Sequence, residues 1–290
     1  MKVLVTGANG YIGSHVVKAL KEAGHWVEGW DINFHGEHNY VSDYLNQFEK
    51  VDVTCPYAVH GTYDTVVHLA GRGSVPQSMV EPSEYYRVNT FGTDNMLKKV
   101  KADHFIFAGT SSSWAMASPY ARSKVAAEDI IKEKSNGYTI FRFFNASGTN
   151  GIFRQLGPAT HLIRVAAMVA ANKLPHITIH GVDYDTRDGS CIRDYIHVTD
   201  IANAIVTAVN NGPKNTPYEC LGSKQGFTVK EVIDAMENTT GKSIHKIIGP
   251  RRKGDSVSNI VDELSDYCKI TKTLHEMCAD QYNLEINNTR

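Results

Sequence analysis

The sequence predicts an α/β fold built on a doubly wound parallel sheet. Three observations lead to this prediction. Apolar segments of strand length alternate with helix-compatible stretches, a glycine-rich turn joins the first strand to the first helix, and small or polar residues stand where the strands end. At 290 residues the chain is long enough for one large α/β domain or two smaller ones with a substantial core.

The first βαβ unit is expected in KVLVTGANGYIGSHVVKALKEAGHWVEGWD. A short apolar strand is followed by a glycine turn and then by a helix whose apolar positions include Val16, Val17, Leu20 and Ala23. A second strand ends at Asp31.

The glycine turn indicates a dinucleotide site. Gly7, Gly10 and Gly13 have the spacing G-x-x-G-x-x-G, which allows a tight turn, while the helix N-terminus offers N–H groups to a pyrophosphate. Asp31, 18 residues beyond Gly13, is the expected acceptor for the adenosine ribose hydroxyls, and its carboxylate would repel a 2′-phosphate. We therefore predict NAD and not NADP as the cofactor. A solvated acid at a strand end is the other interpretation of Asp31.

The later strands extend the same Rossmann-type sheet. They are expected at residues 51–53, 64–71, 104–110 and 139–145. Ligands of such sheets bind beyond the carboxyl ends of the strands. The residues that fall there are Asp52, Ala70, Gly71, Thr110 and Asn145.

Composition excludes several classes of protein. Thirty Lys and Arg balance 31 Asp and Glu, with no basic stripe for nucleic acid. No apolar run approaches the roughly 20 residues that span a bilayer, and the N-terminus does not resemble a signal peptide. The five cysteines are scattered without metal-ligand spacing, which favours reduced thiols. We expect a cytoplasmic protein with no metal, membrane or nucleic-acid partner.

A candidate catalytic segment is GTSSSWAMASPYARSK, in which Tyr120 and Lys124 are four residues apart. On a helix that begins after Pro119 they would share one face. This spacing alone does not distinguish a catalytic pair from a polar loop that leads into an ordinary helix. A free phenol has a pKa of about 10, so lowering it by roughly three units would need about 4 kcal/mol from an adjacent ammonium and a nicotinamide cation.

Several motifs together resemble the extended short-chain dehydrogenase/reductase superfamily. They are VLVTGANGYIGSH, DTVVHLAG, EYYRVNTFGT, SPYARSK, FRFFNASG, DGSCIRDYIHVTDIA and GPRRKGD, in family order over nearly the whole chain. Within the superfamily the chain is most similar to the NAD-dependent sugar-nucleotide epimerases, in particular those acting at C4 of UDP-glucose and UDP-galactose.

The resemblance implies roles for individual residues. Tyr120 would take the proton of the sugar 4-hydroxyl while hydride leaves C4 for NAD, and the transient 4-keto sugar would then take the hydride back on its other face. Lys124 would hold the nicotinamide ribose, Asn89 would brace the cofactor, and Thr110 would relay the proton, with Ser111 or Ser112 as substitutes. The implied cofactor contacts are Gly7, Gly10, Tyr11, Ile12, Gly13, Asp31, Asn33, Asp52, Val53, Leu69, Ala70, Gly71, Asn89, Tyr120, Lys124 and Phe144.

The resemblance also implies a domain division. Residues 1–150 would bind NAD, and residues 151–290 would form a smaller α/β domain for the nucleotide sugar, with part of 176–215 returning to the first domain. The implied substrate contacts are Thr110, Tyr120, Asn145, His161, Leu162, Arg193, Arg252 and Asp255. Surface ion pairs are the other interpretation of Arg193 and Arg252. A homodimer would pair through the helix at residues 84–100 and the helix that follows Tyr120.

Departures from the family pattern keep alternatives open. Dehydratase relatives have an acid directly after the strand-end Thr or Ser, because elimination needs a general acid, whereas Ser111 stands here. A dehydratase, a reductase and a non-catalytic NAD-binding sensor are the alternatives to an epimerase. Asn259, of intermediate size, leaves N-acetylated sugars as candidate substrates. Only nine residues separate Thr110 from Tyr120, fewer than in the 4-epimerases.

Overall fold

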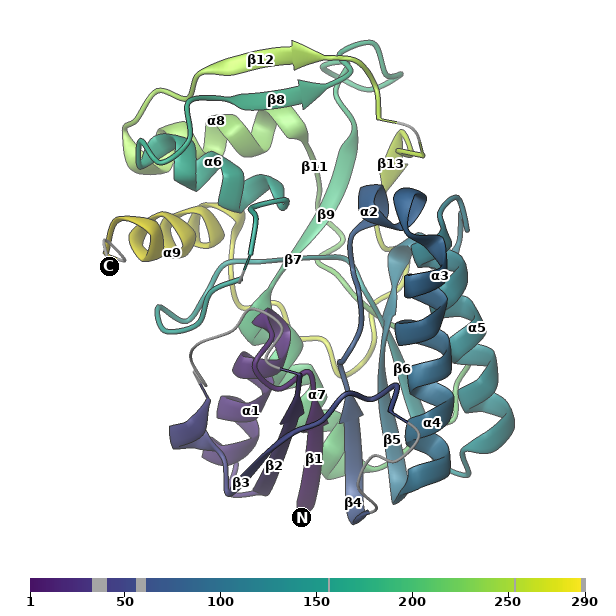
Figure 1. Cartoon of the computed structure of the whole chain (residues 1–290). Helices are drawn as coiled ribbons and strands as arrows, with labels where there is room; N and C mark the ends of the chain where they lie inside the picture. Colours follow the sequence, from purple (N-terminus) through teal and green to yellow (C-terminus); the bar gives the residue numbers. More distant parts are fainter. Residues whose placement is uncertain (33–40, 56–60, 156, 253, 288–290) are drawn as a thin grey trace. The chain divides into compact units, whose positions relative to one another are not determined.

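The computed structural model describes residues 1–32, 41–55, 61–155, 157–252 and 254–287, and it divides the chain into two compact units (Figure 1). The first unit comprises Met1–Phe143 and Ala202–Cys220. The second comprises Phe144–Ile201 and Leu221–Arg290. The first unit therefore ends earlier than the expected residue 150, because residues 145–147 form a strand that pairs within the second unit. The segment that returns to the first unit is 202–220, which overlaps the expected 176–215 only in part.

The first unit is built on a seven-stranded sheet in the order β10-β6-β5-β4-β1-β2-β3. Each pair of neighbouring strands from β6 to β3 in this order is parallel. The strands run β1 (Lys2–Thr6), β2 (Trp26–Asp31), β3 (Gln47–Lys50), β4 (Gly61–His68), β5 (Val100–Thr110), β6 (Tyr138–Phe143) and β10 (Glu219–Leu221). Strand order reverses direction between β1 and β4, and ligands of open α/β sheets bind at such a switch point. The predicted fold class is confirmed.

Helices cover this sheet and fill its core. They are α1 (Tyr11–Glu22), η1 (Ser42–Tyr44), α2 (Val75–Val80), α3 (Pro82–Tyr85), η2 (Tyr86–Phe91), α4 (Gly92–Lys99), η3 (Ser111–Ser113), α5 (Pro119–Lys134) and α7 (Val198–Asn211), the last shared with the second unit. Helix α1 packs on β1 and β2, while α4 and α5 pack on each other and on β5 (Figure 1). Leu4, Val66, Met96, Phe107 and Ile140 are among the buried residues between them. Across the described ranges, no helix has the length and apolar character needed to cross a membrane.

The prediction of a strand at residues 51–53 is wrong, because these residues follow the strand and do not form it. The strand in this region is β3, Gln47–Lys50, which pairs with β2 at the edge of the sheet. Three of its four residues are polar and none is fully buried, so it lacks the apolar pattern of a central strand. Val51 and Val53 are buried because the chain beyond β3 continues into the core without sheet pairing.

The second unit has a helical core beside short strands. Its strands are β7 (Asn145–Ser147), β8 (Ile177–His180), β9 (Ile192–His197), β11 (Gly226–Thr228), β12 (Lys246–Gly249) and β13 (Ser258–Asn259), and its helices are α6 (Leu162–Ala170), α8 (Val229–Thr240) and α9 (Leu274–Asn287). Ile163, Val232, Met236 and Met277 contribute to one buried cluster that joins the three helices. A capping box of Thr228 and Glu231 begins α8.

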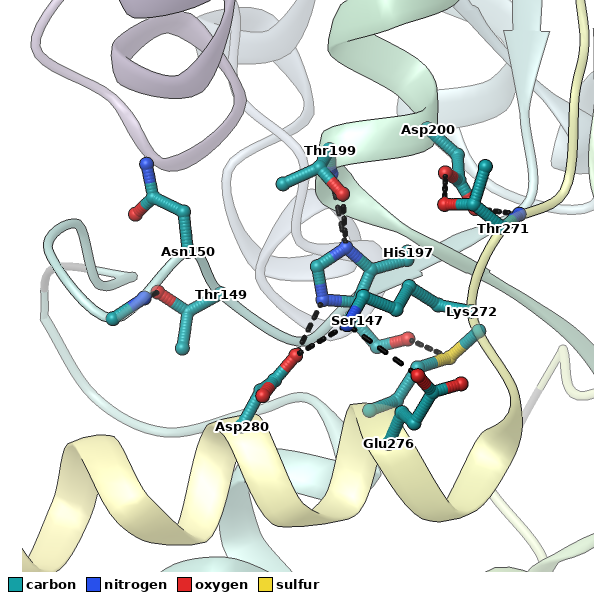
Figure 2. Close-up of polar contacts among 12 residues, drawn as sticks. Ser147, Thr149, Asn150, His197, Thr199, Asp200, Thr271, Lys272, Glu276 and Asp280 are labelled. Atoms are coloured by element: carbon teal, nitrogen blue, oxygen red, sulfur yellow. Dashed lines mark hydrogen bonds and ion pairs between the residues drawn. The ribbon is translucent and has the colours of Figure 1, made fainter.

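Helix α9 is anchored to β7 and β9 by polar contacts (Figure 2). His197 Nε2, at the end of β9, lies 3.3 Å from Asp280 Oδ2, and its Nδ1 lies 2.6 Å from Thr199 Oγ1. Ser147 Oγ contacts Met277 Sδ at 3.0 Å. Burial lowers the pKa of His197 although Asp280 opposes the shift. The anchor therefore joins the end of β9 to the last helix of the unit.

Candidate active site

The turn after β1 admits only glycine at two positions. Gly7 has φ +67°, and a Cβ there would lie 2.8 Å from the Ala70 nitrogen. A Cβ on Gly13 would lie 2.0 Å from the Gly7 oxygen. The Gly10 N–H donates to the same Gly7 carbonyl at 3.0 Å. The turn thus packs directly against the chain that leaves β4, at the switch point of the sheet.

The start of α1 fits the phosphates and ribose of a dinucleotide. No side chain caps the helix at Gly10, and N–H groups in the first turn of a helix lack intrahelical partners. Tyr11 and Ile12 belong to this first turn. The Asp31 carboxylate, at the end of β2, accepts the Asn9 N–H at 2.9 Å, so it is fixed beside the glycine turn. These residues present donors for a pyrophosphate and an acceptor for ribose hydroxyls.

A buried chain of hydrogen bonds connects this turn to Asn89. The Ala70 N–H donates to Thr6 Oγ1 at 3.2 Å, and Thr6 Oγ1 lies 2.7 Å from His68 Nδ1. His68 Nε2 lies 3.1 Å from Thr93 Oγ1, which donates to the Asn89 carbonyl at 2.7 Å. Because the Thr93 proton is used on that carbonyl, His68 donates through Nε2 and accepts from Thr6 through Nδ1. The pattern assigns a neutral imidazole.

This neutral state gives a pH-dependent stability. Burial, with the nearby Lys124 charge, lowers the pKa of His68 from 6.5 to about 3. A histidine with a depressed folded-state pKa stabilises the fold above its unfolded pKa of 6.5 and loses that stability as pH falls below it. We expect His68 alone to lower the free energy of unfolding by about 2 kcal/mol between pH 8 and pH 5.

Denaturant unfolding of the wild type and of His68→Asn at both pH values checks this expectation. The variant should be less stable than the wild type at pH 8, because it loses the buried contacts of His68. It should lose less stability on acidification, because the other histidines are common to both proteins and only His68 differs. An equal loss in the two proteins would show that His68 takes up no proton on unfolding.

Asn89 links the cofactor side to the catalytic helix. Its Oδ1 accepts the Arg72 N–H at 2.8 Å, and its Nδ2 donates to the Arg72 carbonyl at 3.1 Å and to Ser123 Oγ at 3.0 Å. Ser123 Oγ in turn donates to the Tyr120 carbonyl at 2.8 Å. Asn89 lies in the π-helical turn η2, a local widening that is frequent at functional sites. The expected long helix at 84–100 is therefore interrupted at Asn89.

Lys124 lies at the carboxyl edge of the sheet. Its Nζ donates to the Ala108 carbonyl at 2.9 Å. A Cβ on Gly71 would lie 3.0 Å from both Lys124 Nζ and Asn89 Oδ1. Gly71, Asn89 and Lys124 are thus brought together, as the sequence predicts. Burial lowers the pKa of Lys124 to about 8, and the Glu128 carboxylate opposes this shift.

Tyr120 lies beside Thr110 and Tyr85. Burial raises the pKa of Tyr120, while a hydrogen bond with Thr110 opposes the rise. The Tyr85 ring meets the Tyr120 ring edge to face at 6.3 Å, and within the described part of the chain the buried Tyr85 hydroxyl has no hydrogen-bond partner. Burial therefore favours the neutral phenol of Tyr120 in the protein without cofactor.

The other predicted cofactor residues surround the same edge. Asp52 Oδ1 accepts the Thr54 N–H at 2.8 Å, and the Val53 carbonyl accepts Asn95 Nδ2 at 2.8 Å. Leu69 follows β4 directly, and its N–H donates to the Thr6 carbonyl at 3.2 Å. Asn33 lies outside the described residues.

Phe144 and the predicted substrate residues from Asn145 onward belong to the second unit. Arg193 Nη2 lies 3.6 Å from Asp255 Oδ1. Asn145 Nδ2 donates to the Asp194 carbonyl at 2.8 Å. The Phe144 N–H donates to the Leu221 carbonyl. Leu162 is the first residue of α6, and His161 precedes it. The Asp255 N–H donates to the carbonyl of Arg252, whose side chain is exposed. Arg193 and Asp255 meet as an ion pair, so both interpretations of this arginine stay in place, and the UDP contacts stay a prediction.

Sequence reasoning missed the Thr6–His68–Thr93 relay and Ser123. A signal was present for two of them, because Thr6 and His68 are polar residues at the ends of two apolar, neighbouring strands. No sequence signal singled out Thr93 or Ser123, since both are small hydroxyl residues within helices.

A tyrosine–lysine pair beside a glycine-turn dinucleotide cradle defines a class of NAD-dependent enzymes, and comparison with known proteins gives the family. The model of the NAD dependent epimerase/dehydratase family matches residues 3–220. The chain belongs to this family. The expected superfamily and the NAD cofactor are confirmed by this membership.

Individual relatives agree with the family. The UDP-glucose 4-epimerase of Halalkalibacterium halodurans is 36% identical over 90% of this chain and 86% of its own length. The crystal structure of UDP-glucose 4-epimerase from Bifidobacterium longum in complex with NAD⁺ and UDP has a TM-score of 0.90 at 28% identity, covering 99% of each chain. The UDP-Glc/GlcNAc 4-epimerase from Campylobacter jejuni has a TM-score of 0.79 at 29% identity, covering 98% of each chain.

Proposed function

We propose that this chain interconverts UDP-glucose and UDP-galactose by NAD-dependent epimerisation at C4. The observation that carries the proposal is the placement of Lys124 beside Gly71 and Asn89, with Asn89 joined through Ser123 to the backbone of Tyr120. The relatives named above are 4-epimerases of UDP-sugars, which supports the same substrate class for this chain.

The residues of the first unit divide the chemistry among them. Bound NAD would accept the hydride from C4 of the sugar and would return it to the same carbon. Tyr120 takes the 4-hydroxyl proton and gives it back, and Thr110, whose side chain lowers the pKa of Tyr120, relays that proton. The Lys124 ammonium, fixed by the Ala108 carbonyl, favours the phenolate and is placed to hold the nicotinamide ribose.

The residue after Thr110 favours epimerisation over dehydration. Ser111 is buried and its hydroxyl has no acidity near neutral pH, so it does not replace the general acid that loss of water needs. A reductase would consume stoichiometric NAD(P)H, whereas an epimerase needs no added reductant. A non-catalytic sensor has no use for both Tyr120 and Lys124.

The decisive experiment incubates the purified protein with UDP-galactose and follows the anomeric signals by NMR, without added reductant. UDP-glucose should accumulate to equilibrium. Protein that holds NAD yet converts neither UDP-galactose nor UDP-glucose would refute the substrate proposal. The appearance of a 4-keto-6-deoxy sugar would identify a dehydratase.

N-acetylated UDP-hexoses are second candidate substrates. Asn259 of β13 pairs in register with Arg193 of β9, and Arg193 is a predicted contact of the UDP phosphates. Its intermediate size supports a pocket that admits an N-acetyl group, and the Campylobacter jejuni relative is named for both sugar types. The same NMR assay with UDP-N-acetylglucosamine tests this candidate. Asn259→Tyr places a bulkier side chain at this position, so it should reduce the turnover of UDP-N-acetylglucosamine more than the turnover of UDP-glucose.

We also propose a cytoplasmic homodimer that acts in galactose metabolism. The five cysteines are free, which fits a reducing compartment. Met79, Val80, Tyr86 and Phe91 are exposed apolar residues of the consecutive helices α2 to η2, and we assign them to the contact with a second copy of the chain.

Phe91→Glu should convert the dimer to a monomer. Phe91 is 47% exposed, so the substitution disturbs no core, but it places a charge in an apolar contact. Sedimentation analysis of the wild type and the variant at matched concentration measures the effect. Val182→Glu, a comparably exposed apolar position in the second unit, is the control that should leave the mass unchanged. A wild type that sediments as a monomer at micromolar concentration would contradict the proposed dimer.

A further inference from the structure

The short segment between Thr110 and Tyr120 contacts a buried arginine. Trp114 is 45% exposed, yet the Arg142 guanidinium lies 5.4 Å from the centre of its ring and 3.9 Å from that of Tyr218. The Trp114 and Tyr218 rings meet edge to face at 5.9 Å. Contacts of a cation with aromatic faces contribute about 0.5–2 kcal/mol each. One cation therefore joins the active-site segment to the loop before β10.

Glu128 fixes this arginine. Arg142 Nε donates to Glu128 Oε1 at 3.1 Å, and Nη2 donates to Oε2 at 2.7 Å. The two side chains are 9% and 0% exposed. A Cβ on Gly109 would lie 2.8 Å from Glu128 Oε1, so the pair packs directly against the strand end that precedes Thr110. The two parallel hydrogen bonds leave the planar guanidinium a single orientation for stacking.

Glu128 also belongs to the catalytic helix. Tyr120, Lys124 and Glu128 follow each other at four-residue intervals on α5, which places them along one face. From the same helix, Arg122 Nη1 donates to the Met116 carbonyl at 3.0 Å. Residues 111–118 are thus tied to α5 at Ser118, which caps the helix, at Met116 through Arg122, and at Trp114 through Arg142 and Glu128.

We propose that Arg142, held by Glu128, is a positioning residue that fixes residues 111–118 through Trp114 and so aligns Thr110 with Tyr120. The inference rests on the proposed epimerase function, because alignment of these two hydroxyls matters for proton transfer. Residues 114–117 are exposed, so an aromatic side chain seated on a fixed cation supplies a restraint in the middle of the segment. Trp114 and Arg142 act through the position of other groups and transfer no proton.

The first test compares Trp114→Ala with Trp114→Phe. Trp114→Ala should lower kcat for UDP-galactose by about 10- to 100-fold, since misplacement of a catalytic group by about 1 Å has effects of this size. KM and the unfolding midpoint should change far less, because the side chain is half exposed. Trp114→Phe keeps an aromatic ring on Arg142, so its fold-decrease in kcat should be less than about a tenth of that in Trp114→Ala. Ile248→Ala, another exposed apolar truncation, controls for general surface effects. Full kcat in Trp114→Ala would overturn the proposal.

The second test changes the cation and leaves Trp114 in place. Arg142→Lys keeps the charge beside Glu128 but loses the planar stacking surface, so kcat should fall about 10-fold in a stable protein. The double variant Glu128→Gln with Arg142→Met removes both charges, leaves neither unpaired, and should show the same loss of kcat. A double variant with wild-type kcat would reduce the pair to a structural role and overturn the proposal.

Tryptophan fluorescence provides a readout without substrate. The chain has three tryptophans, and Trp114→Phe defines the signal of Trp26 and Trp30. After subtraction, iodide should quench Trp114 more strongly in Arg142→Lys than in the wild type, and equal quenching would show that Arg142 does not hold the indole. If the wild type converts no UDP-sugar, the proposed function fails, whereas the quenching comparison still decides whether the stack holds the segment.

Discussion

Tyr120→Phe should retain NAD and lose turnover by about 10²- to 10⁴-fold, the range that a positioned general acid–base contributes. The substitution removes one oxygen and leaves the edge-to-face packing against Tyr85 in place. Its backbone contact with Ser123 also persists, since the Tyr120 carbonyl accepts that bond. Turnover of UDP-galactose, measured by NMR in protein of equal NAD content, gives the size of the effect.

Two observations decide how the result is interpreted. NAD content, from the absorbance of the released nucleotide, should equal that of the wild type, because the ring still packs in the same place. Retention of full kcat with normal NAD content would remove Tyr120 from the role of proton acceptor and would make Thr110 or the buried Tyr85 hydroxyl the next group to test.

Lys124→Met should lower kcat by about 10²- to 10³-fold and should also weaken NAD retention. In the proposed mechanism the ammonium favours the Tyr120 phenolate, so its removal should cost most of the roughly 4 kcal/mol that a three-unit pKa shift needs. Methionine keeps the length and apolar character of the side chain and fills the same buried space.

The pH dependence of kcat separates charge from packing in this variant. With a pKa of about 8, the wild-type ammonium is largely present at pH 7 and is lost as pH rises through 8. Kcat of the wild type should therefore carry a contribution from Lys124 that declines above pH 8, and Lys124→Met should lack that decline. Lys98→Met, on the exposed surface of α4, is the matched control. An unchanged profile in Lys124→Met would show that the lysine serves packing alone.

Much of the first unit could be predicted from sequence because its signals are local. The glycine turn, the strand ends and the Tyr120–Lys124 spacing each reflect a constraint within a few residues. The strand at β3 was misplaced because an edge strand with polar residues carries no apolar pattern, while the buried Val51 and Val53 beside it do. Burial and strand pairing are separate properties, and the sequence shows the first more clearly.

The supporting network could not be predicted because it is made by tertiary proximity. Nothing in the local sequence joins Glu128 to Arg142, which are 14 residues apart on a helix and a strand, or Arg142 to Tyr218. The local sequence did not predict the π-helical turn that contains Asn89 either.

The bifunctional contact of Asn89 limits how this enzyme can be redesigned. Its carbonyl ends the relay that begins at the glycine turn, and its amide supports the helix that carries Tyr120. The segment behind the glycine turn and the helix of Tyr120 therefore share one mechanical support. A substitution that displaces Asn89 should disturb both, whereas a change of Asp31, which lies outside this network, should leave the position of Tyr120 unchanged.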